Sequence, residues 1–303
     1  DALTLRFTGQ TTFRAPHPDE MSQTQVTALA YVGQTGAFKA VDIYGNTNLD
    51  PETATTFNVG VISDFGTDNW TMTLDYYDFV IDNPIQNQNY AQLAAAYEAG
   101  GAAKAAIQSQ IYGGTNLTND GSFSAASIGR IRSNFVNGPE VQTNGLDLFV
   151  KYETDYADGV LSAGMEANWI LKYSTEAYNI GAVQIAGAYD CAGYFNIENS
   201  CRSMPELKAK AFVNYITDKH NVYGAINHIN AYDDRRSNVE IQAHTTIDAN
   251  YTYSFDEQSS MTVSVYNLTD EAPPFTFWEM SYDPNTHNPL GRNLKIGFTY
   301  LMD

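Results

Sequence analysis

The sequence predicts an all-β protein whose strands run up and down in an antiparallel, membrane-spanning barrel. Three observations predict this fold class. Apolar and polar residues alternate along most of the chain, charged residues keep to one face of the alternating segments, and long and short connections follow each other in turn. Together these patterns predict ten strands within the 303 residues.

Period-two alternation marks eight of the strands clearly. At the start of the chain, Leu3, Leu5 and Phe7 alternate with Thr4 and Arg6. Successive side chains of a strand point to opposite faces, so the three apolar residues share one face. The same pattern recurs in seven further segments: 70–77, 145–152, 161–172, 207–215, 246–253, 261–265 and 293–302. Two weaker strands are expected near 56–65 and 220–232, and the second has no clear apolar face.

The two faces of these strands differ in charge. The apolar faces carry none, and a charge facing lipid costs about 2–4 kcal/mol at the centre of a bilayer. Ten charged residues fall on the opposite faces: Arg6, Asp75, Asp147, Lys151, Glu166, Lys172, Lys208, Lys210, Asp248 and Lys295. Alternation alone does not separate a membrane barrel from a soluble sandwich, because the strands of a sandwich also alternate.

The lengths of the connections separate the two folds. Short turns are expected at 66–69, 155–158, 218–219 and 256–258. Long loops are expected at 10–55, 83–140, 174–204, 233–243 and 269–290. All long loops then fall at one end of the sheet, as in outer-membrane barrels with short periplasmic turns and long extracellular loops. A Greek-key sandwich distributes its loops to both ends.

One long loop breaks the β pattern. Residues 89–112 are rich in alanine and carry apolar residues at helical spacing, with an interruption at Gly100-Gly101. We expect a short pair of helices outside the membrane, which serves loop packing or, alternatively, acts as a lid or a ligand contact.

The composition disfavours several classes of protein. There are 16 Lys and Arg against 35 Asp and Glu, a net charge of −19, whereas nucleic-acid binding needs clustered basic residues. The sequence contains no apolar run long enough for a transmembrane helix. No signal peptide is visible, and the strand pattern begins at once, so we expect the chain to start within a larger protein.

The two cysteines, Cys191 and Cys201, lie ten residues apart in a segment rich in Gly, Asn and Ser. A pair this close in a loop predicts a local disulfide and an oxidising compartment, with two free thiols as the alternative. A zinc site is not expected there, because no His or further Cys stands nearby at ligand spacing.

Five short motifs resemble the barrel domain of TonB-dependent outer-membrane receptors. They are Phe-Arg-Ala-Pro at 13–16, Leu-Asp-Pro-Glu at 49–52, Thr-Asn-Gly-Leu-Asp at 143–147, Asn-Leu-Thr-Asp-Glu-Ala-Pro-Pro at 267–274 and Gly-Arg at 291–292. The motif at 267–274 is the sharpest match. Each motif is weak alone, but in this order and spacing they are specific, and the resemblance covers residues 1–303.

The resemblance implies that residues 1–303 are the C-terminal portion of the receptor barrel, about the last ten of 22 strands. The N-terminal plug and the first strands would lie outside this sequence. It also implies an outer-membrane location in a Gram-negative bacterium and TonB-energised uptake of a scarce nutrient: a ferric siderophore, cobalamin or an oligosaccharide. Loops would capture the nutrient and the plug would gate its passage. One departure is the C-terminus, where Met302 and Asp303 stand in place of the family's usual terminal aromatic residue.

The partners implied are a small-molecule nutrient, the inner-membrane TonB–ExbB–ExbD system reached through the plug, and outer-membrane lipid and lipopolysaccharide. No nucleic acid and no cofactor are expected. The net negative charge favours neutral or cationic ligands over polyanionic chelates, unless the remainder of the protein reverses it.

Candidate ligand contacts are arginine, aromatic and amide side chains near the long loops. Aromatic rings stack on sugars or chelator rings, and arginines bind anionic groups. The candidates are Arg14, Tyr189, Tyr194, Phe195, Asn196, Arg235, Arg236, Phe277, Trp278, Tyr282 and Arg292. Ordinary loop packing is the alternative for each of them, and pairing with loop carboxylates is the alternative for Arg14 and Arg292.

We expect no enzyme, because the sequence has no HExxH, Gly-x-Ser-x-Gly or phosphate-loop motif. His17 with Asp19 and Glu20, and Asp283 with His287, could be metal clusters, but polar loops produce such groupings by chance. Two alternative functions remain. A soluble all-β glycan-binding module leaves the rhythm of loop lengths unexplained, and a passive porin or outer-membrane enzyme would lack the plug.

Overall fold

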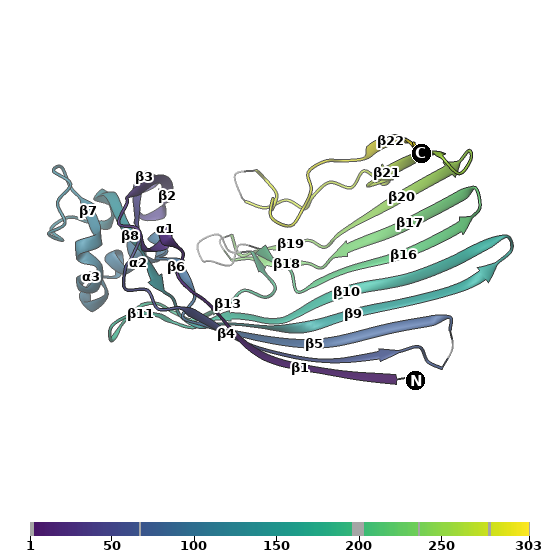
Figure 1. Ribbon diagram of the computed structural model, residues 1–303. Helices are drawn as coiled ribbons and strands as arrows, with labels where there is room; N and C mark the ends of the chain where they lie inside the picture. The colour runs from purple at the N-terminus through teal and green to yellow at the C-terminus, as the bar shows by residue number, and fades with distance from the viewer. Residues whose placement is uncertain (1–2, 67, 196–202, 236, 278–279, 303) are drawn as a thin grey trace.

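The computed structural model describes residues 3–66, 68–195, 203–235, 237–277 and 280–302. Its main body is a long curved antiparallel sheet in which ten strands follow each other in chain order (Figure 1). The strands are β1 (Leu3–Arg14), β4 (Glu52–Ser63), β5 (Trp70–Asp82), β9 (Val141–Tyr156), β10 (Gly159–Thr175), β16 (Leu207–Thr217), β17 (His220–Ile229), β20 (His244–Ser254), β21 (Ser259–Tyr266) and β22 (Asn293–Tyr300). The predicted fold class is confirmed. Within the described residues the barrel is not closed, and β1 and β22 form the two edges.

The two ends of this sheet differ in their connections. The segments 64–69, 157–158, 218–219 and 255–258 link neighbouring strands at one end, which we call the turn end. The segments 15–51, 83–140, 176–206, 230–243 and 267–292 link them at the other, which we call the loop end. Both chain termini lie toward the turn end in Figure 1.

The sequence did not show which face of the strand β17 is apolar, and the pairing of this strand with its neighbour identifies that face. Val222 lies opposite Tyr215 on one neighbouring strand, and Ile226 lies opposite Ala211. Directly paired residues share a face of the sheet, so Val222 and Ile226 lie on the apolar face. Asn227 therefore points to the opposite face.

A β-bulge in β10 corrects one prediction. Leu171 is an extra residue between Ile170 and Lys172, so Lys172 pairs with Asn144, on the same face as Leu146. The prediction that Lys172 lies on the charged face is therefore wrong, because the bulge reverses the alternation after Ile170. Near the loop end the Lys172 Nζ donates to Gln142 Oε1 at 2.8 Å.

The connections 15–51 and 83–140 pack together as a small α/β unit at the loop end (Figure 1). Its five-stranded sheet consists of β2 (Val26–Val32), β3 (Ala37–Tyr44), β6 (Ile85–Asn87), β7 (Ile111–Gly113) and β8 (Ile128–Asn137). Its helical segments are α1 (Pro18–Met21), α2 (Tyr90–Ala99), α3 (Gly101–Ile107) and the short 3₁₀ turns η1 (Gly33–Thr35), η2 (Gln108–Gln110) and η3 (Ala125–Ser127). The predicted helix pair is confirmed as α2 and α3.

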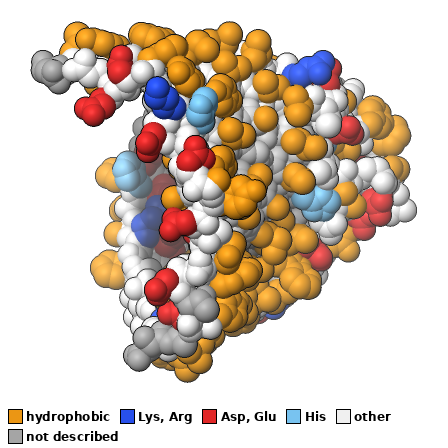
Figure 2. All heavy atoms as spheres, turned by 90° about the vertical axis from the view of Figure 1, so that its right-hand side faces the viewer, with side chains coloured by type: hydrophobic (Ala, Val, Ile, Leu, Met, Phe, Trp, Pro, Cys, Tyr) orange, Lys and Arg blue, Asp and Glu red, His pale blue; other side chains and the backbone are white. Residues whose placement is uncertain are grey.

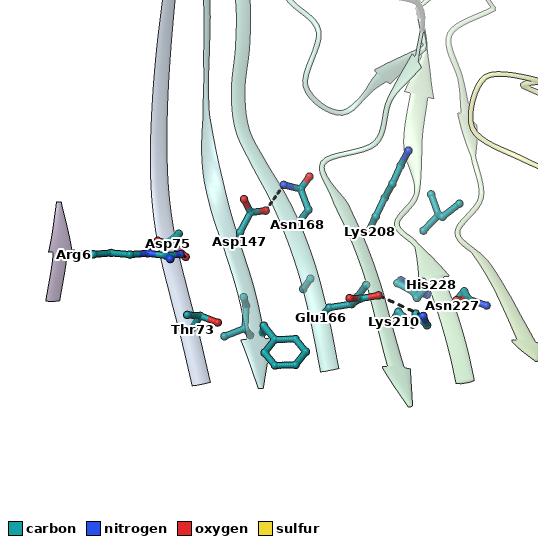
Figure 3. Close-up of a pocket in the computed structure, with 15 residues that line it drawn as sticks. Arg6, Thr73, Asp75, Asp147, Glu166, Asn168, Lys208, Lys210, Asn227 and His228 are labelled. Atoms are coloured by element: carbon teal, nitrogen blue, oxygen red, sulfur yellow. Dashed lines mark hydrogen bonds and ion pairs between the residues drawn. The ribbon is translucent and has the colours of Figure 1, made fainter. Parts of the chain in front are cut away.

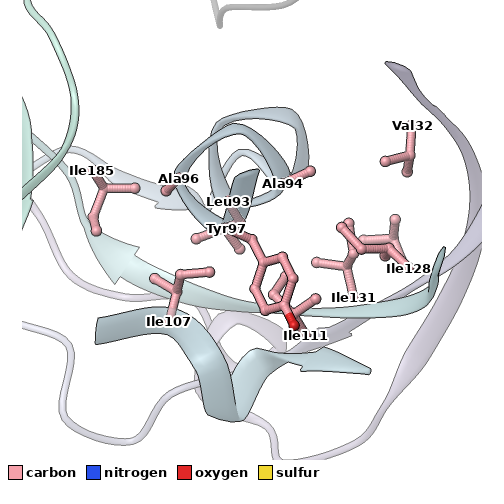
Figure 4. Packing of buried hydrophobic residues seen from close by; sticks show 11 residues of the cluster. Val32, Leu93, Ala94, Ala96, Tyr97, Ile107, Ile111, Ile128, Ile131 and Ile185 are labelled. Carbon is pink, nitrogen blue, oxygen red and sulfur yellow. The ribbon is translucent and has the colours of Figure 1, made fainter. Parts of the chain in front are cut away.

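This unit has its own hydrophobic core. Leu93 and Tyr97 of α2 pack with Ile107, Ile111 and Ile131, and all five side chains are buried (Figure 4). Gly100 separates the two helices with a φ of 77°, a left-handed value that favours glycine. The core holds the two long connections in a defined position above the sheet.

The remaining connections form smaller sheets. The strands β11 (Tyr178–Ile180) and β12 (Val183–Ala186) form a hairpin, and β13 (Tyr189–Asp190) adds to β10. A four-stranded sheet has the order β15 (Ser203–Met204), β14 (Tyr194–Phe195), β18 (Tyr232–Asp234) and β19 (Val239–Ile241). None of the helices described has the length and hydropathy needed to span a bilayer.

Candidate functional site

A polar hollow of about 650 Å³ lies on the charged face of the main sheet (Figure 3). Six of the charged residues predicted for that face line it together: Arg6, Asp75, Asp147, Glu166, Lys208 and Lys210. They come from β1, β5, β9, β10 and β16, which follow each other in the sheet with only β4 inserted, between β1 and β5. The strand alternation therefore turns scattered charges into one wall.

An ion pair crosses a strand within this hollow. Arg6 on β1 donates from Nε to Asp75 Oδ1 at 2.8 Å, and its Nη2 also contacts Asp75 Oδ2. Gly60 of β4 pairs with both residues and lies between them. A Cβ at position 60 would lie only 2.0 Å from Asp75 Oδ1, so the ion pair depends on glycine there.

The other charges of the hollow differ in how they are paired. Asn168 donates to Asp147 Oδ1 at 2.7 Å, and the Lys210 Nζ lies 3.5 Å from Glu166 Oε1. Lys208 has no ion-pair partner within the described part of the chain. Three basic and three acidic side chains line the hollow, so its wall is balanced although the whole chain is strongly acidic.

At the loop end, a second group of polar side chains is buried. Tyr232, His244, Asp283 and His287 are each less than 9 % exposed. The Tyr232 hydroxyl donates to Asp283 Oδ2 at 2.7 Å, and Ser203 also donates to that oxygen. Burial and hydrogen bonding to Asp283 raise the pKa of Tyr232, which keeps its hydroxyl protonated. The cluster joins β15, β18 and β20 to the connection 267–292.

Two predicted arginine contacts take part in loop structure. Arg14 forms ion pairs with Glu20 at 3.0 Å and Glu52 at 2.7 Å, which is the carboxylate pairing considered for it. The Arg292 amide donates to Asp270 Oδ1 at 2.7 Å, and its guanidinium lies near the Leu268 carbonyl oxygen.

Three predicted contacts come together at the four-stranded sheet: Tyr194 and Phe195 form β14, and Arg235 directly follows β18. The Arg235 guanidinium stacks 3.7 Å from the centre of the Tyr194 ring, a cation–π contact. Phe195 is buried against Tyr232 and Ile241 and contributes to packing.

The other aromatic candidates are dispersed. Tyr189 lies in β13 and lines the same small hollow as Tyr178. Tyr282 is half-buried, and Phe277 is exposed with its ring against Phe275. Asn196, Arg236 and Trp278 lie outside the described residues. Cys191 is disulfide-bonded, and its predicted partner Cys201 also lies outside them.

The suggested metal clusters have other structural roles. The His17 amide donates to Glu20 at 2.6 Å and the His17 ring contacts Asp19, an arrangement that caps α1. In the part of the chain that the structure describes, no group of three or more His, Cys, Asp or Glu is placed to hold a metal ion.

The sequence reasoning missed two features of these sites. The hollow includes Thr73, Asn168, Asn227 and His228, which were not candidates. Counting polar residues on the charged strand faces would have found most of them. Of the buried cluster, the sequence singled out only Asp283 with His287; Tyr232 and His244 had no such signal, because they come from separate segments.

The fold and the hollow define the wall of a β-barrel, and the comparisons with known proteins agree. Residues 1–268 match the family model described as TonB dependent receptor-like, beta-barrel. The chain therefore belongs to the TonB-dependent receptor β-barrel family, as its motifs predicted. The family comprises outer-membrane receptors and transporters rather than enzymes. No curated protein sequence matches the chain.

Solved structures of low sequence identity share the fold. A ferric enterobactin receptor from Pseudomonas aeruginosa has a TM-score of 0.62 at 14% identity, over 99% of this chain and 38% of that one. The siderophore receptor PirA from Acinetobacter baumannii has a TM-score of 0.60 at 15% identity, over 98% and 39%. The Serratia marcescens hemophore receptor HasR, in complex with its hemophore HasA and heme, has a TM-score of 0.58 at 15% identity, over 99% and 37%. The chain thus spans less than two fifths of each of these proteins.

Proposed function

We propose that this chain is the C-terminal wall of an outer-membrane receptor for TonB-energised uptake of a ferric chelate such as a siderophore or heme. The observation that carries the proposal is the hollow, where the charges of five strands converge on one face of a sheet whose other face is apolar. The structural neighbours named for siderophores and heme support the ligand class. Cobalamin and oligosaccharides, the other nutrients considered, are outcomes of the test below.

The apolar face contacts outer-membrane lipid in this proposal. Val213, Val222 and Ile226 lie on interior strands, yet each is 48% exposed. Hydrophobic side chains cover much of the surface seen from the turn end (Figure 2). Apolar area on this scale is unusual on a protein surrounded by water and is what a bilayer would cover.

The hollow then faces the interior of the complete barrel and lines the route of the ligand. Its three basic side chains offset its three acidic ones, so this wall does not repel an anionic chelate as the net charge of −19 suggests. Lys208, which has no ion-pair partner among the described residues, supplies a positive charge to such a ligand.

At the loop end, the stacked Tyr194 and Arg235 side chains are the strongest of the candidate ligand contacts. An arginine held flat on an aromatic ring keeps its N–H groups directed outward, where they can bind carboxylate or phenolate oxygens of a chelate. Loop capture, gating by a plug in the remainder of the protein, and energy from the TonB–ExbB–ExbD system complete the proposed transport. The apolar outer face and the loop-end rim meet lipid and lipopolysaccharide.

Uptake by bacteria tests the proposal. The complete protein containing this chain is expressed in cells with and without TonB, and uptake of labelled ferric siderophores and heme is compared with that of cobalamin and oligosaccharides. We expect saturable uptake of an iron chelate that is lost without TonB. Uptake that persists without TonB would indicate a passive porin, and uptake of cobalamin or oligosaccharide alone would exclude the iron ligands.

A further inference from the structure

Two buried histidines join the last long connection to the main sheet. His244 is the first residue of β20, and His287 belongs to the connection 267–292. Their Nδ1 atoms lie 3.2 Å apart, and the two side chains are 8 % and 4 % exposed. A hydrogen bond between two imidazoles needs one nitrogen that carries a proton and one that does not.

The surrounding hydrogen bonds fix which nitrogen carries the proton. The Tyr232 hydroxyl donates to Asp283 Oδ2, so its oxygen accepts from His287 Nε2, which lies 3.0 Å away. In neutral His287 the Nδ1 is then unprotonated and accepts from His244 Nδ1. The His244 Nε2 is left as a buried acceptor with no hydrogen-bond partner among the described residues.

This chain of hydrogen bonds from Tyr232 through His287 to His244 stays intact when it takes up one extra proton, but not when it takes up two. A first proton can bind to His244 Nε2 without disturbing the bond between the rings. A second proton would place N–H groups on both Nδ1 atoms, so that two positively charged rings face each other at hydrogen-bond distance. The bond would be lost and replaced by repulsion inside a buried site.

The charged groups around the two histidines shift the pKa of His287 in opposite directions. Asp283, which is fully buried, favours the protonated form of His287, whereas Lys208 and a charged His244 oppose it. Burial has the largest effect, and the pKa of His287 falls to about 4. Asp248 on β20 shares with both histidines a hollow of about 470 Å³ that is open to protons from solvent.

We infer that His244 and His287 form an acid-sensitive latch, which holds residues 283–287 against β20 and β18 at neutral pH and releases them when both rings are protonated. The released segment carries Asp283, whose bonds to Ser203 and Tyr232 tie it to β15 and β18. Acidification therefore loosens this connection before it unfolds the sheet. This inference does not depend on the identity of the transported ligand.

Hydrogen exchange of the complete protein in detergent micelles tests the latch. Protection factors, corrected for the intrinsic effect of pH, are measured for peptides that contain the amides of Asn285 and His287. Both amides donate to Asp283. We expect these factors to fall at least tenfold between pH 7 and pH 4.5, while those of β17 stay constant.

Three variants decide whether the histidines cause the change. In His287→Asn the fall with pH should disappear, and in His244→Gln it should become smaller, because burial still lowers the pKa of His287 in that variant. His220 is the exposed first residue of β17, and its ring contacts the Tyr251 hydroxyl, so in the control His220→Gln the fall should be as in the wild type. Constant protection in the wild type, or an undiminished fall in His244→Gln and His287→Asn, would overturn the inference.

Discussion

Arg6 and Asp75 form a two-bond ion pair that passes directly over Gly60, on the strand between them. The pair links β1 to β5 across β4, so it adds a side-chain connection to the backbone ladder of the sheet. Asp75 is nearly fully buried, which makes the loss of its partner costly.

A side chain at position 60 should break this pair. We expect Gly60→Val to lower the thermal unfolding temperature of the complete protein, because an unsatisfied buried carboxylate costs more than the about 1–3 kcal/mol of a neutral buried group. Heat-dependent migration in detergent gels measures the change. Gly224→Ala on β17 is the matched control, since a Cβ there makes only ordinary contacts of 3.8 Å or more. Equal stability of the two variants would show that the pair contributes nothing.

Lys208 should contribute to the binding of an anionic ligand. We expect Lys208→Gln to raise the Kd for the transported chelate about tenfold, or about 1.4 kcal/mol, because the substitution removes from the hollow a positive charge that has no ion-pair partner among the described residues. Equilibrium binding to the purified receptor measures this. Lys151→Gln is the control, because the Lys151 Nζ lies 2.6 Å from Glu153 and is already neutralised. An unchanged Kd for Lys208→Gln would place the ligand elsewhere.

The two kinds of loop arginine should behave differently. We expect Arg235→Gln to weaken ligand capture threefold to tenfold, because the Tyr194 ring loses the cation that it orients. Arg14→Gln should leave the Kd unchanged, since the Arg14 guanidinium is occupied by Glu20 and Glu52. Equilibrium binding of the ligand is measured on both variants. A larger rise of the Kd in Arg14→Gln than in Arg235→Gln would show that Arg14, and not Arg235, is the ligand contact.

Glu140 should make the stability depend on pH. Desolvation, followed by the charges of Glu176 and Asp82, raises the pKa of Glu140 above its usual value. A carboxylic acid whose pKa is raised by folding binds its proton more tightly in the folded state than in the unfolded state. The free energy of unfolding is therefore highest at low pH and falls as the pH rises through the folded pKa. We expect Glu140→Gln to raise the unfolding temperature at pH 7 and not at pH 4. The exposed Glu98→Gln is the control, and an effect independent of pH would contradict the account.

The main sheet could be predicted because eight of its ten strands carry a clear signal of their own. Leu146, Leu148 and Val150 alternate with polar residues whether or not a neighbouring strand is known, and the position of the turns follows from the same pattern. For the same reason the six charged residues of the hollow could be assigned to one face.

The features that sequence could not predict depend on contacts between distant segments. The bulge at Leu171 appears only in the pairing of β10 with β9, and it moves Lys172 to the other face. The His244–His287 contact joins residues 43 positions apart across two connections. No periodicity encodes such a contact, because each residue alone fits an ordinary polar loop or strand end.

The central claim is that the apolar strand faces contact lipid while the charged faces line a watery interior. Spin labels at Ile226→Cys and Asn227→Cys, adjacent residues on opposite faces of β17, test it in the complete protein reconstituted into bilayers. We predict that the label at 226 collides mainly with lipid-soluble oxygen and the label at 227 mainly with a water-soluble nickel chelate. Equal access of the nickel chelate to both positions, or the reverse order, would contradict the account.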